Sequence, residues 1–184
     1  IATTEVGAEL VLLPAIPDFL ASHPALTLEI DASPRLADLS RDDEWIALRF
    51  ADPVKGDHVV RRLGEITFGL FAAPTAPRDR GIGWTATFAE LSLARFVDQR
   101  FPHQVIRLGS VRAHRGAAEL GLGVAALPTF AAGASLERVG TDELTLPVWL
   151  VIPRGIRRLG RVVAAASWVE SAFAAVRRGP VPGA

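Results

Sequence analysis

Residues 110–128 constrain the fold more than any other part of the chain. Ser110 is a favoured helix N-cap, because its hydroxyl can accept a hydrogen bond from a backbone N–H group left over at a helix start. Gly121 and Gly123 are placed to end that helix, since glycine adopts positive φ at little cost. The apolar run 124–127 then predicts a buried strand, and the sequence helix, glycine turn, strand is typical of α/β proteins.

The rest of the chain alternates between predicted strands and predicted helices. Strands are expected at 1–4, 26–30, 45–50, 59–63, 66–73, 93–97, 105–108, 136–139 and 146–152. Helices are expected at 10–20, 36–41, 128–132 and 162–176, with a turn-rich connector at 78–83. Pro14 and Pro17 imply that the first helix either starts late, near Pro14, or is kinked. This order predicts an α/β fold.

Composition excludes several classes of protein. The 184 residues carry 20 basic and 20 acidic side chains, so a nucleic-acid surface, which would show a basic excess, is not expected on this piece. No apolar run reaches the roughly 18–20 residues that a membrane helix needs. Cysteine is absent, so the chain has neither disulfides nor thiolate metal sites.

Catalytic and metal-binding motifs are also missing. The chain has no Gly-x-Ser-x-Gly elbow to anchor a hydrolase triad. Its four histidines (His23, His58, His103 and His114) share no spacing of the kind that binds metals. The sequence Gly-Leu-Gly at 121–123 ends a helix instead of opening one, so it does not indicate a dinucleotide site. We therefore expect no enzyme activity, metal or cofactor.

Five stretches, in order, resemble the effector-binding domain of LysR-type transcriptional regulators. The sequence at 110–128 is similar to the family's "S…AGLGVA.LP" signature, and Trp-Ile-Ala-Leu-Arg-Phe at 45–50 is similar to its "AIRF" strand. The other three matches are residues 1–4, the helix and strand over 12–30, and the return strand at 146–154. The resemblance covers nearly the whole chain.

This resemblance implies a fold of two Rossmann-like lobes joined by two crossover strands, as in type 2 periplasmic binding proteins. Lobe I would comprise residues 1–72 plus 148–178, and lobe II residues 73–147. Residues 179–184 are expected to form a disordered tail. The family's N-terminal helix-turn-helix precedes this region and is absent here, so DNA would be contacted only through that missing domain.

The expected ligand site lies at the carboxyl ends of strands, where open α/β sheets bind ligands. Three ends qualify: Thr3-Thr4, Arg49-Phe50-Ala51 and Gly109-Ser110. They offer hydrogen-bond donors without a general base, which suits recognition of a small anion such as a carboxylate. The expected effector-binding residues are Thr3, Thr4, Ser33, Arg49, Phe50, Ala51, Gly109 and Ser110. Two alternatives stay open: the threonines could cap the next helix, and Arg49 could form an internal ion pair with Asp31 or Asp52.

The resemblance implies the ligand-sensing and oligomerisation half of a cytoplasmic bacterial regulator. Its partners would be a small-molecule effector and further copies of the chain, as a homodimer or homotetramer that uses the first helix; no membrane contact is expected. The rival interpretation is a solute-binding protein of a transport system, with similar lobes and a similar cleft. The sequence upstream would discriminate between the two interpretations. A helix-turn-helix there would indicate the regulator, and a secretion signal would indicate the solute-binding protein.

Overall fold

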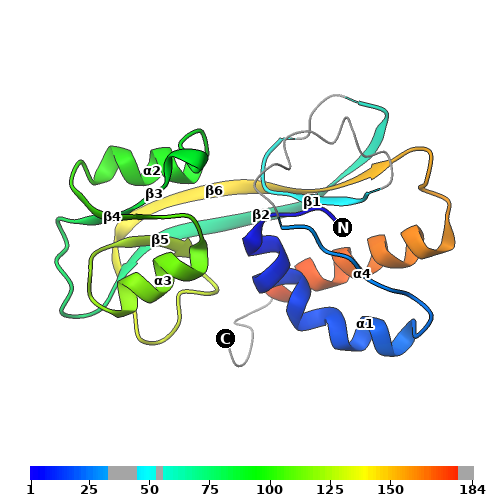
Figure 1. Ribbon diagram of the computed structural model, residues 1–184, viewed down its shortest axis with the longest axis horizontal. Helices are drawn as coiled ribbons and strands as arrows, with labels where there is room; N and C mark the ends of the chain where they lie inside the picture. The colour runs from blue at the N-terminus through cyan, green and yellow to red at the C-terminus, as the bar shows by residue number, and fades with distance from the viewer. Residues whose placement is uncertain (33–44, 53–55, 178–184) are drawn as a thin grey trace. The chain divides into compact units, whose positions relative to one another are not determined.

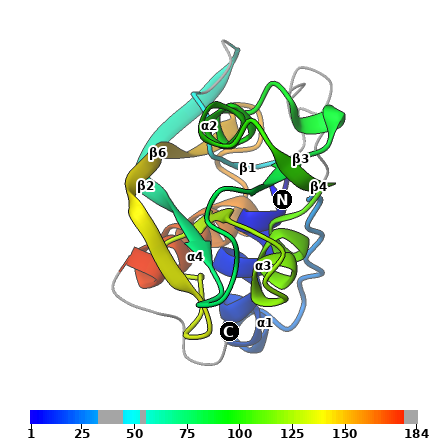
Figure 2. The same cartoon turned by 90° about the vertical axis from the view of Figure 1, so that its left-hand side faces the viewer.

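The computed structural model describes residues 1–32, 45–52 and 56–177. Ser33, the helix expected at 36–41 and the expected tail at 179–184 lie outside these residues. The chain divides into two compact units: unit 2 is Thr67–Thr145, and unit 1 is formed by the described residues before and after it. Two long strands, β2 (His58–Ala72) and β6 (Glu137–Pro153), run from one unit into the other. They are neighbours in a sheet of strand order β1-β6-β2-β5, and Figures 1 and 2 show them side by side.

Each of these long strands replaces two shorter strands of the sequence prediction. The stretches 59–63 and 66–73 were expected to be separate, as were 136–139 and 146–152, and both separations are wrong. In β2 the expected break falls at Gly64, whose φ of +146° keeps the chain extended. In β6 Gly140 has a φ of +67° within the strand. Glycine tolerates both conformations, so a residue that often marks a turn is here accommodated inside a strand.

Unit 1 joins three distant chain segments along one sheet. β1 (Ala47–Arg49) pairs antiparallel with β6, with Leu48 opposite Leu150. Ala2 forms parallel bridges to both Ala47 and Asp31. The strand expected at 26–30 is not formed, since pairing is limited to Asp31. Its alternating pattern instead reflects half-buried side chains at 26, 28 and 30 between exposed ones at 27 and 29.

The helices of unit 1 pack against each other through aromatic residues. The first helical segment changes geometry along its length, through η1 (Val6–Leu12), η2 (Leu13–Ala15) and α1 (Ile16–Ser22). It therefore does not start late: it changes form around Pro14, which cannot donate a helical hydrogen bond. The indole of Trp168 in α4 (Gly160–Arg177) donates to the carbonyl of Ala15 at 3.0 Å and stacks on Phe19.

Unit 2 surrounds a parallel strand pair with helices. β3 (Gly81–Trp84) pairs with β4 (Gln104–Leu108), and Gly81 also bridges to Val124, which leads into β5 (Ala125–Pro128). β5 pairs antiparallel with β2, Leu127 opposite Gly69. Helices α2 (Ser92–Arg100) and α3 (Val111–Glu119) lie on opposite sides of these strands, and the 3-10 turn η3 (Ala86–Phe88) follows β3 (Figure 1).

The helix–glycine–strand prediction for residues 110–128 is confirmed. α3 ends at Glu119, Gly121 follows with a φ of +75°, and β5 begins at Ala125. Three other predictions in unit 2 are wrong. Residues 93–97 lie in helix α2 and not in a strand. Of the helix expected at 128–132, Pro128 ends β5 and residues 129–132 form a turn and a bend. β3 falls partly in the stretch expected to be turn-rich.

Candidate functional site

The carboxyl ends of three parallel segments meet at one edge of unit 1, which we call the unit 1 edge: residues 3–4, 31–32 and 49–51. The bridges of Ala2 to Ala47 and Asp31 set this register. Backbone hydrogen bonds support it, from Leu48 N to Ala2 O at 3.0 Å and from Thr3 N to Asp31 O at 2.8 Å. Five of the expected site residues therefore lie at one edge, while Ser33 falls just beyond the described residues.

The two threonines have structural contacts. Thr3 is fully buried, and its Oγ1 donates to the carbonyl of Leu48 at 3.0 Å, which ties the N-terminal segment to β1. Thr4 is exposed, and its Oγ1 accepts from Gly7 N at 3.3 Å, as a helix-capping residue does. Thr3 is thus covered by protein, whereas Thr4 is exposed at the unit 1 edge.

Arg49 is the one cationic side chain among the expected site residues. It ends β1 opposite Trp149 and is half-buried. Its Nη1 is shielded from solvent and has no hydrogen-bond partner within the described residues. Burial lowers the pKa of the guanidinium from its ordinary value. A partly desolvated guanidinium with an unused N–H donor is suited to bind an anion.

Phe50 and Ala51 complete the unit 1 edge. Phe50 is half-buried against the start of the first helical segment: a methyl group at Gly7 would lie 3.0 Å from its Cε2. Ala51 is exposed. The edge therefore combines one guanidinium with an aromatic side chain and an exposed backbone.

Gly109 and Ser110 belong to unit 2, at the junction of β4 and α3. Ser110 is the expected N-cap, and its Oγ accepts from Ala113 N at 3.1 Å. Gly109 has no side chain, and a methyl group there would reach the Phe88 ring at 3.4 Å. The structure brings together the site residues within each unit; the approach of Ser110 to Arg49 stays a prediction.

His114 is a residue of this region that sequence reasoning missed. It is fully buried, and its ring lies between two backbone carbonyls, with Nδ1 2.7 Å from Ser110 O and Nε2 2.9 Å from Gly83 O. Burial lowers its pKa, which the two carbonyls partly oppose. The helical spacing of Val111, His114 and Ala118 was the available signal, because it places the imidazole on the buried side of α3.

The described ranges offer neither a metal-binding cluster nor a membrane-spanning helix. Residues 1–32, 45–52 and 56–177 hold no group of three or more His, Cys, Asp or Glu residues that could bind a metal ion. None of the helices in that part of the chain is long and apolar enough to span a membrane.

Two α/β units linked by two long strands, with hydrogen-bond donors at strand ends, define a ligand-binding domain of the type 2 periplasmic-binding class. Residues 1–174 match the family model described as LysR substrate binding domain, and the chain belongs to this family. The expected family and fold class are thereby confirmed.

Individual relatives agree with this assignment. The chain is 28% identical over 185 residues to the Mau operon transcriptional activator of Paracoccus denitrificans, covering 95% of this chain and 64% of that protein. It therefore spans less than two thirds of this curated relative.

Solved structures share the fold. The effector domain of AmpR from Pseudomonas aeruginosa aligns with a TM-score of 0.71 at 21% identity, covering 96% of both chains. Full-length LysG from Corynebacterium glutamicum with bound effector Arg aligns with a TM-score of 0.72 at 17% identity, covering 94% of this chain and 66% of that one. At such identities these structures establish the fold alone.

Proposed function

We propose that this chain senses a small anionic effector for a LysR-type transcriptional regulator, and that Arg49 binds the effector's negative charge. The observation that carries the proposal is the Arg49 guanidinium, half-buried at the unit 1 edge with Nη1 unpartnered in the described chain. A guanidinium fork matches a carboxylate in a bidentate arrangement, so a carboxylate is the favoured ligand group.

The other expected site residues take supporting parts in this proposal. Thr4 and the exposed backbone at Ala51 would contact the effector beside Arg49. Ser110 would approach from unit 2, where the start of α3 offers backbone N–H groups and a partial positive charge. Thr3 would act indirectly, by holding the N-terminal segment against β1.

The effector would act by population shift between arrangements of the regulator. A ligand can change such an equilibrium only by the difference in its affinity for the two states. Arginine, the effector named for the LysG structure, carries a carboxylate, which is compatible with this class of ligand. The family match favours a regulator over a transport solute-binding protein.

The proposal extends to the location, DNA contact and assembly of the regulator. The regulator would be cytoplasmic and without enzyme activity, and would contact DNA through a part of the protein that this chain does not include. The zero net charge of these 184 residues supports the view that they carry no DNA-binding surface. It would assemble as a homodimer or homotetramer through apolar surface on the first helical segment, where Leu13 is 58% exposed.

The test is a thermal-shift screen of small carboxylates (acetate, succinate, benzoate and L-arginine), followed by calorimetric titration of the best binder. Arg49→Ala should weaken that ligand by about ten- to a hundredfold, because a charge-assisted hydrogen bond contributes roughly 1.5–3 kcal/mol. Arg49→Lys should retain part of the affinity, since it keeps the charge but loses the fork.

Arg95→Ala is the matched control, since Arg95 is an exposed arginine of α2. It should leave affinity unchanged. A large loss of stability in Arg49→Ala with unchanged carboxylate affinity would contradict the assignment and leave Arg49 as a structural residue.

A further inference from the structure

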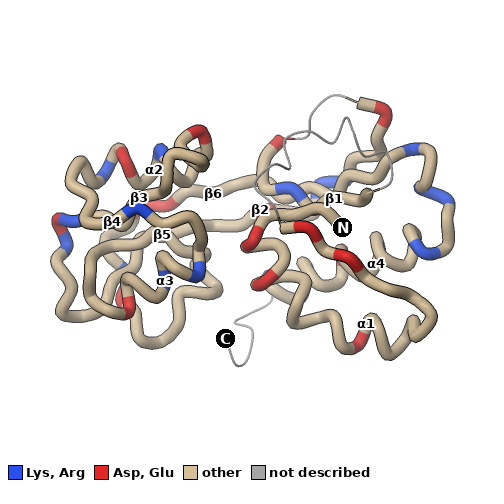
Figure 3. The backbone as a smooth tube through the Cα atoms, viewed as in Figure 1, with Lys and Arg blue, Asp and Glu red and all other residues tan. Residues whose placement is uncertain are grey.

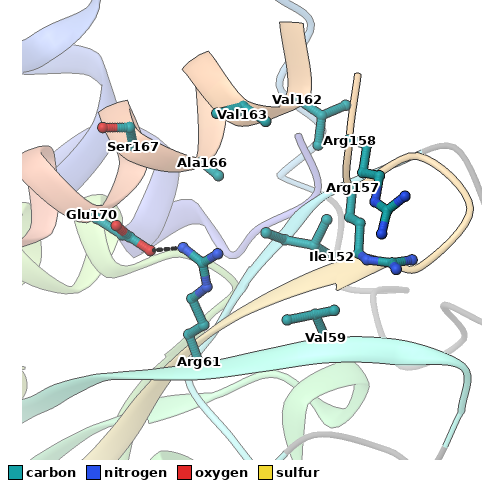
Figure 4. A pocket seen from close by; sticks show the side chains of 10 residues that line it. All are labelled: Val59, Arg61, Ile152, Arg157, Arg158, Val162, Val163, Ala166, Ser167 and Glu170. Carbon is teal, nitrogen blue, oxygen red and sulfur yellow. Dashed lines mark hydrogen bonds and ion pairs between the residues drawn. The ribbon is translucent and has the colours of Figure 1, made fainter. Parts of the chain in front are cut away.

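Unit 1 contains a hollow outside the unit 1 edge. It has a volume of about 440 Å³ and is bounded by β2, β6, the turn after β6 and α4 (Figure 4). This volume lies within the range of small-molecule pockets. None of its lining residues is among the expected effector-binding residues, so it is a separate feature of the unit.

The floor of the hollow is apolar and comes from three elements. β2 and β6 contribute Val59 and Ile152, and α4 contributes Val162, Val163 and Ala166. Val163 is 54% exposed although it is a large aliphatic residue. An apolar ligand body would remove this surface from water, which is favourable in proportion to the area covered.

Positive charge is concentrated at one end of the hollow. Arg157 and Arg158 lie together there, whereas Arg61 at the other end is paired with Glu170 at 2.7 Å (Figure 4). Arg157 donates to the carbonyl of Arg154, and neither Arg157 nor Arg158 forms an ion pair with a described carboxylate. Three arginines against one glutamate leave the lining with an excess of two positive charges.

The local sequence places no negative charge near this end. The turn at 154–159 carries three arginines and no acidic residue, as the blue segments between β6 and α4 in Figure 3 show. Arg154, the first of them, pairs with Asp57 at 2.9 Å, which leaves Arg157 and Arg158 as the two arginines of this turn without an ion pair among the described residues. The first turn of α4 also has no acidic residue, so its partial positive charge adds to theirs.

We propose that this hollow binds an amphipathic organic anion, a carboxylate on an apolar body. The carboxylate would pair with Arg157 and Arg158, and the apolar body would lie over Val59, Ile152 and Ala166. This combination of an apolar floor with a few convergent polar groups is typical of small-molecule sites. The chain then has a second ligand site, independent of the effector proposed at Arg49.

The experiment titrates octanoate into the 184-residue chain with labelled valine and isoleucine methyl groups, observed by NMR. Octan-1-ol supplies the same body without the charge, and acetate supplies the charge without the body. Saturable shifts are expected at Val59, Ile152 and Val163 with octanoate, and at least tenfold weaker binding with either control compound. Equal binding of octan-1-ol, or no shift at these methyl groups, would overturn the proposal.

Variants locate the site. Arg158→Gln removes an exposed arginine without a described partner, so the fold should be kept, and octanoate should bind about tenfold more weakly. Arg95→Gln removes the same charge from α2 and should change nothing, and neither should Arg49→Ala. Equal weakening by Arg158→Gln and Arg95→Gln would reveal a general charge effect. Loss in Arg49→Ala alone would place octanoate at the unit 1 edge, and either result would refute the second site.

Discussion

The imidazole of His114 stacks on the indole of Trp84, with ring centroids 4.2 Å apart and planes inclined by 26°. Because the same ring lies between the carbonyls of Ser110 and Gly83, it connects the first turn of α3 to β3. Ser110, the N-cap residue proposed to face the effector, is thus fixed through its backbone carbonyl by the buried ring of His114.

Replacing this histidine should destabilise the protein. His114→Phe keeps an aromatic ring against Trp84 but removes the hydrogen bonding, and an unsatisfied buried polar group costs about 1–3 kcal/mol. Urea denaturation should show a loss of this size. His103→Phe, at an exposed position, should stay within about 0.5 kcal/mol of the parent. Equal effects of the two variants would contradict the role of His114.

Stability should also depend on pH through His114. Its pKa in the folded protein is lowered from the ordinary 6.5 by burial, so below that value the unfolded chain binds a proton that the folded chain resists. The stability that neutral His114 contributes is therefore complete above pH 6.5. It decreases as the pH falls below 6.5 towards the lowered pKa of the folded state. Denaturation between pH 7.5 and 5 measures this slope. His114→Phe should reduce the slope, and an unchanged slope would count against the assignment.

The Ser110 cap can be tested separately from ligand binding. Ser110→Ala removes the acceptor for Ala113 N and should cost about 1 kcal/mol of stability. Ser110→Asp can still cap the helix and should recover most of that loss. Thermal unfolding without ligand distinguishes the variants. If Ser110→Ala were as stable as the parent, the cap would contribute nothing.

Two glycines should respond to alanine in opposite directions. A methyl group at Gly7 would lie 2.0 Å from Thr3 Oγ1, so Gly7→Ala must displace the hydroxyl that bonds to Leu48. At Gly116 in α3 a methyl group meets no atom within 4 Å, and alanine should add about 0.5–1 kcal/mol. Chemical denaturation of both variants checks the signs. A stabilised Gly7→Ala protein would show that the edge is less tightly packed than described.

Self-association should depend on the exposed apolar surface of the first helical segment. Leu13 on this segment is 58% exposed. Light scattering at tens of micromolar, a concentration chosen for a weak interface, should show a dimer. Leu13→Glu should shift it to monomer, while Val60→Glu, at another exposed apolar position, should not. A monomeric parent protein would contradict the proposed assembly.

Local signals in the sequence were sufficient for part of this structure. The Ser110 cap, the positive φ at Gly121 and strand β5 all follow from residues close in the chain. The buried side of the last helix follows from its spacing, and its predicted members are buried, including Val169 and Phe173. At the candidate site, strand ends and residue type were enough to bring Thr4 and Arg49 to one edge.

Other features depend on tertiary neighbours. β3 contains two glycines that suggest a turn, but a methyl group at Gly81 would lie 2.5 Å from Phe101 Cβ, so the glycine allows close packing within a buried strand. Helix α2 was mistaken for a strand because a run of five residues cannot by itself distinguish the two. The hollow beside Arg158 depends on β2, β6 and α4 together, and no local pattern predicts it.

The hydroxyls of Thr67 and Thr145, the first and last residues of unit 2, lie 3.2 Å apart. Unit 2 is therefore an insertion whose two ends meet, and all of its residues are synthesised before the second half of unit 1. Since domains generally fold as units during synthesis, unit 2 can complete its fold first. β1, which ends at Arg49, pairs with β6, so this pairing at the unit 1 edge can form only after the chain beyond unit 2 has been synthesised.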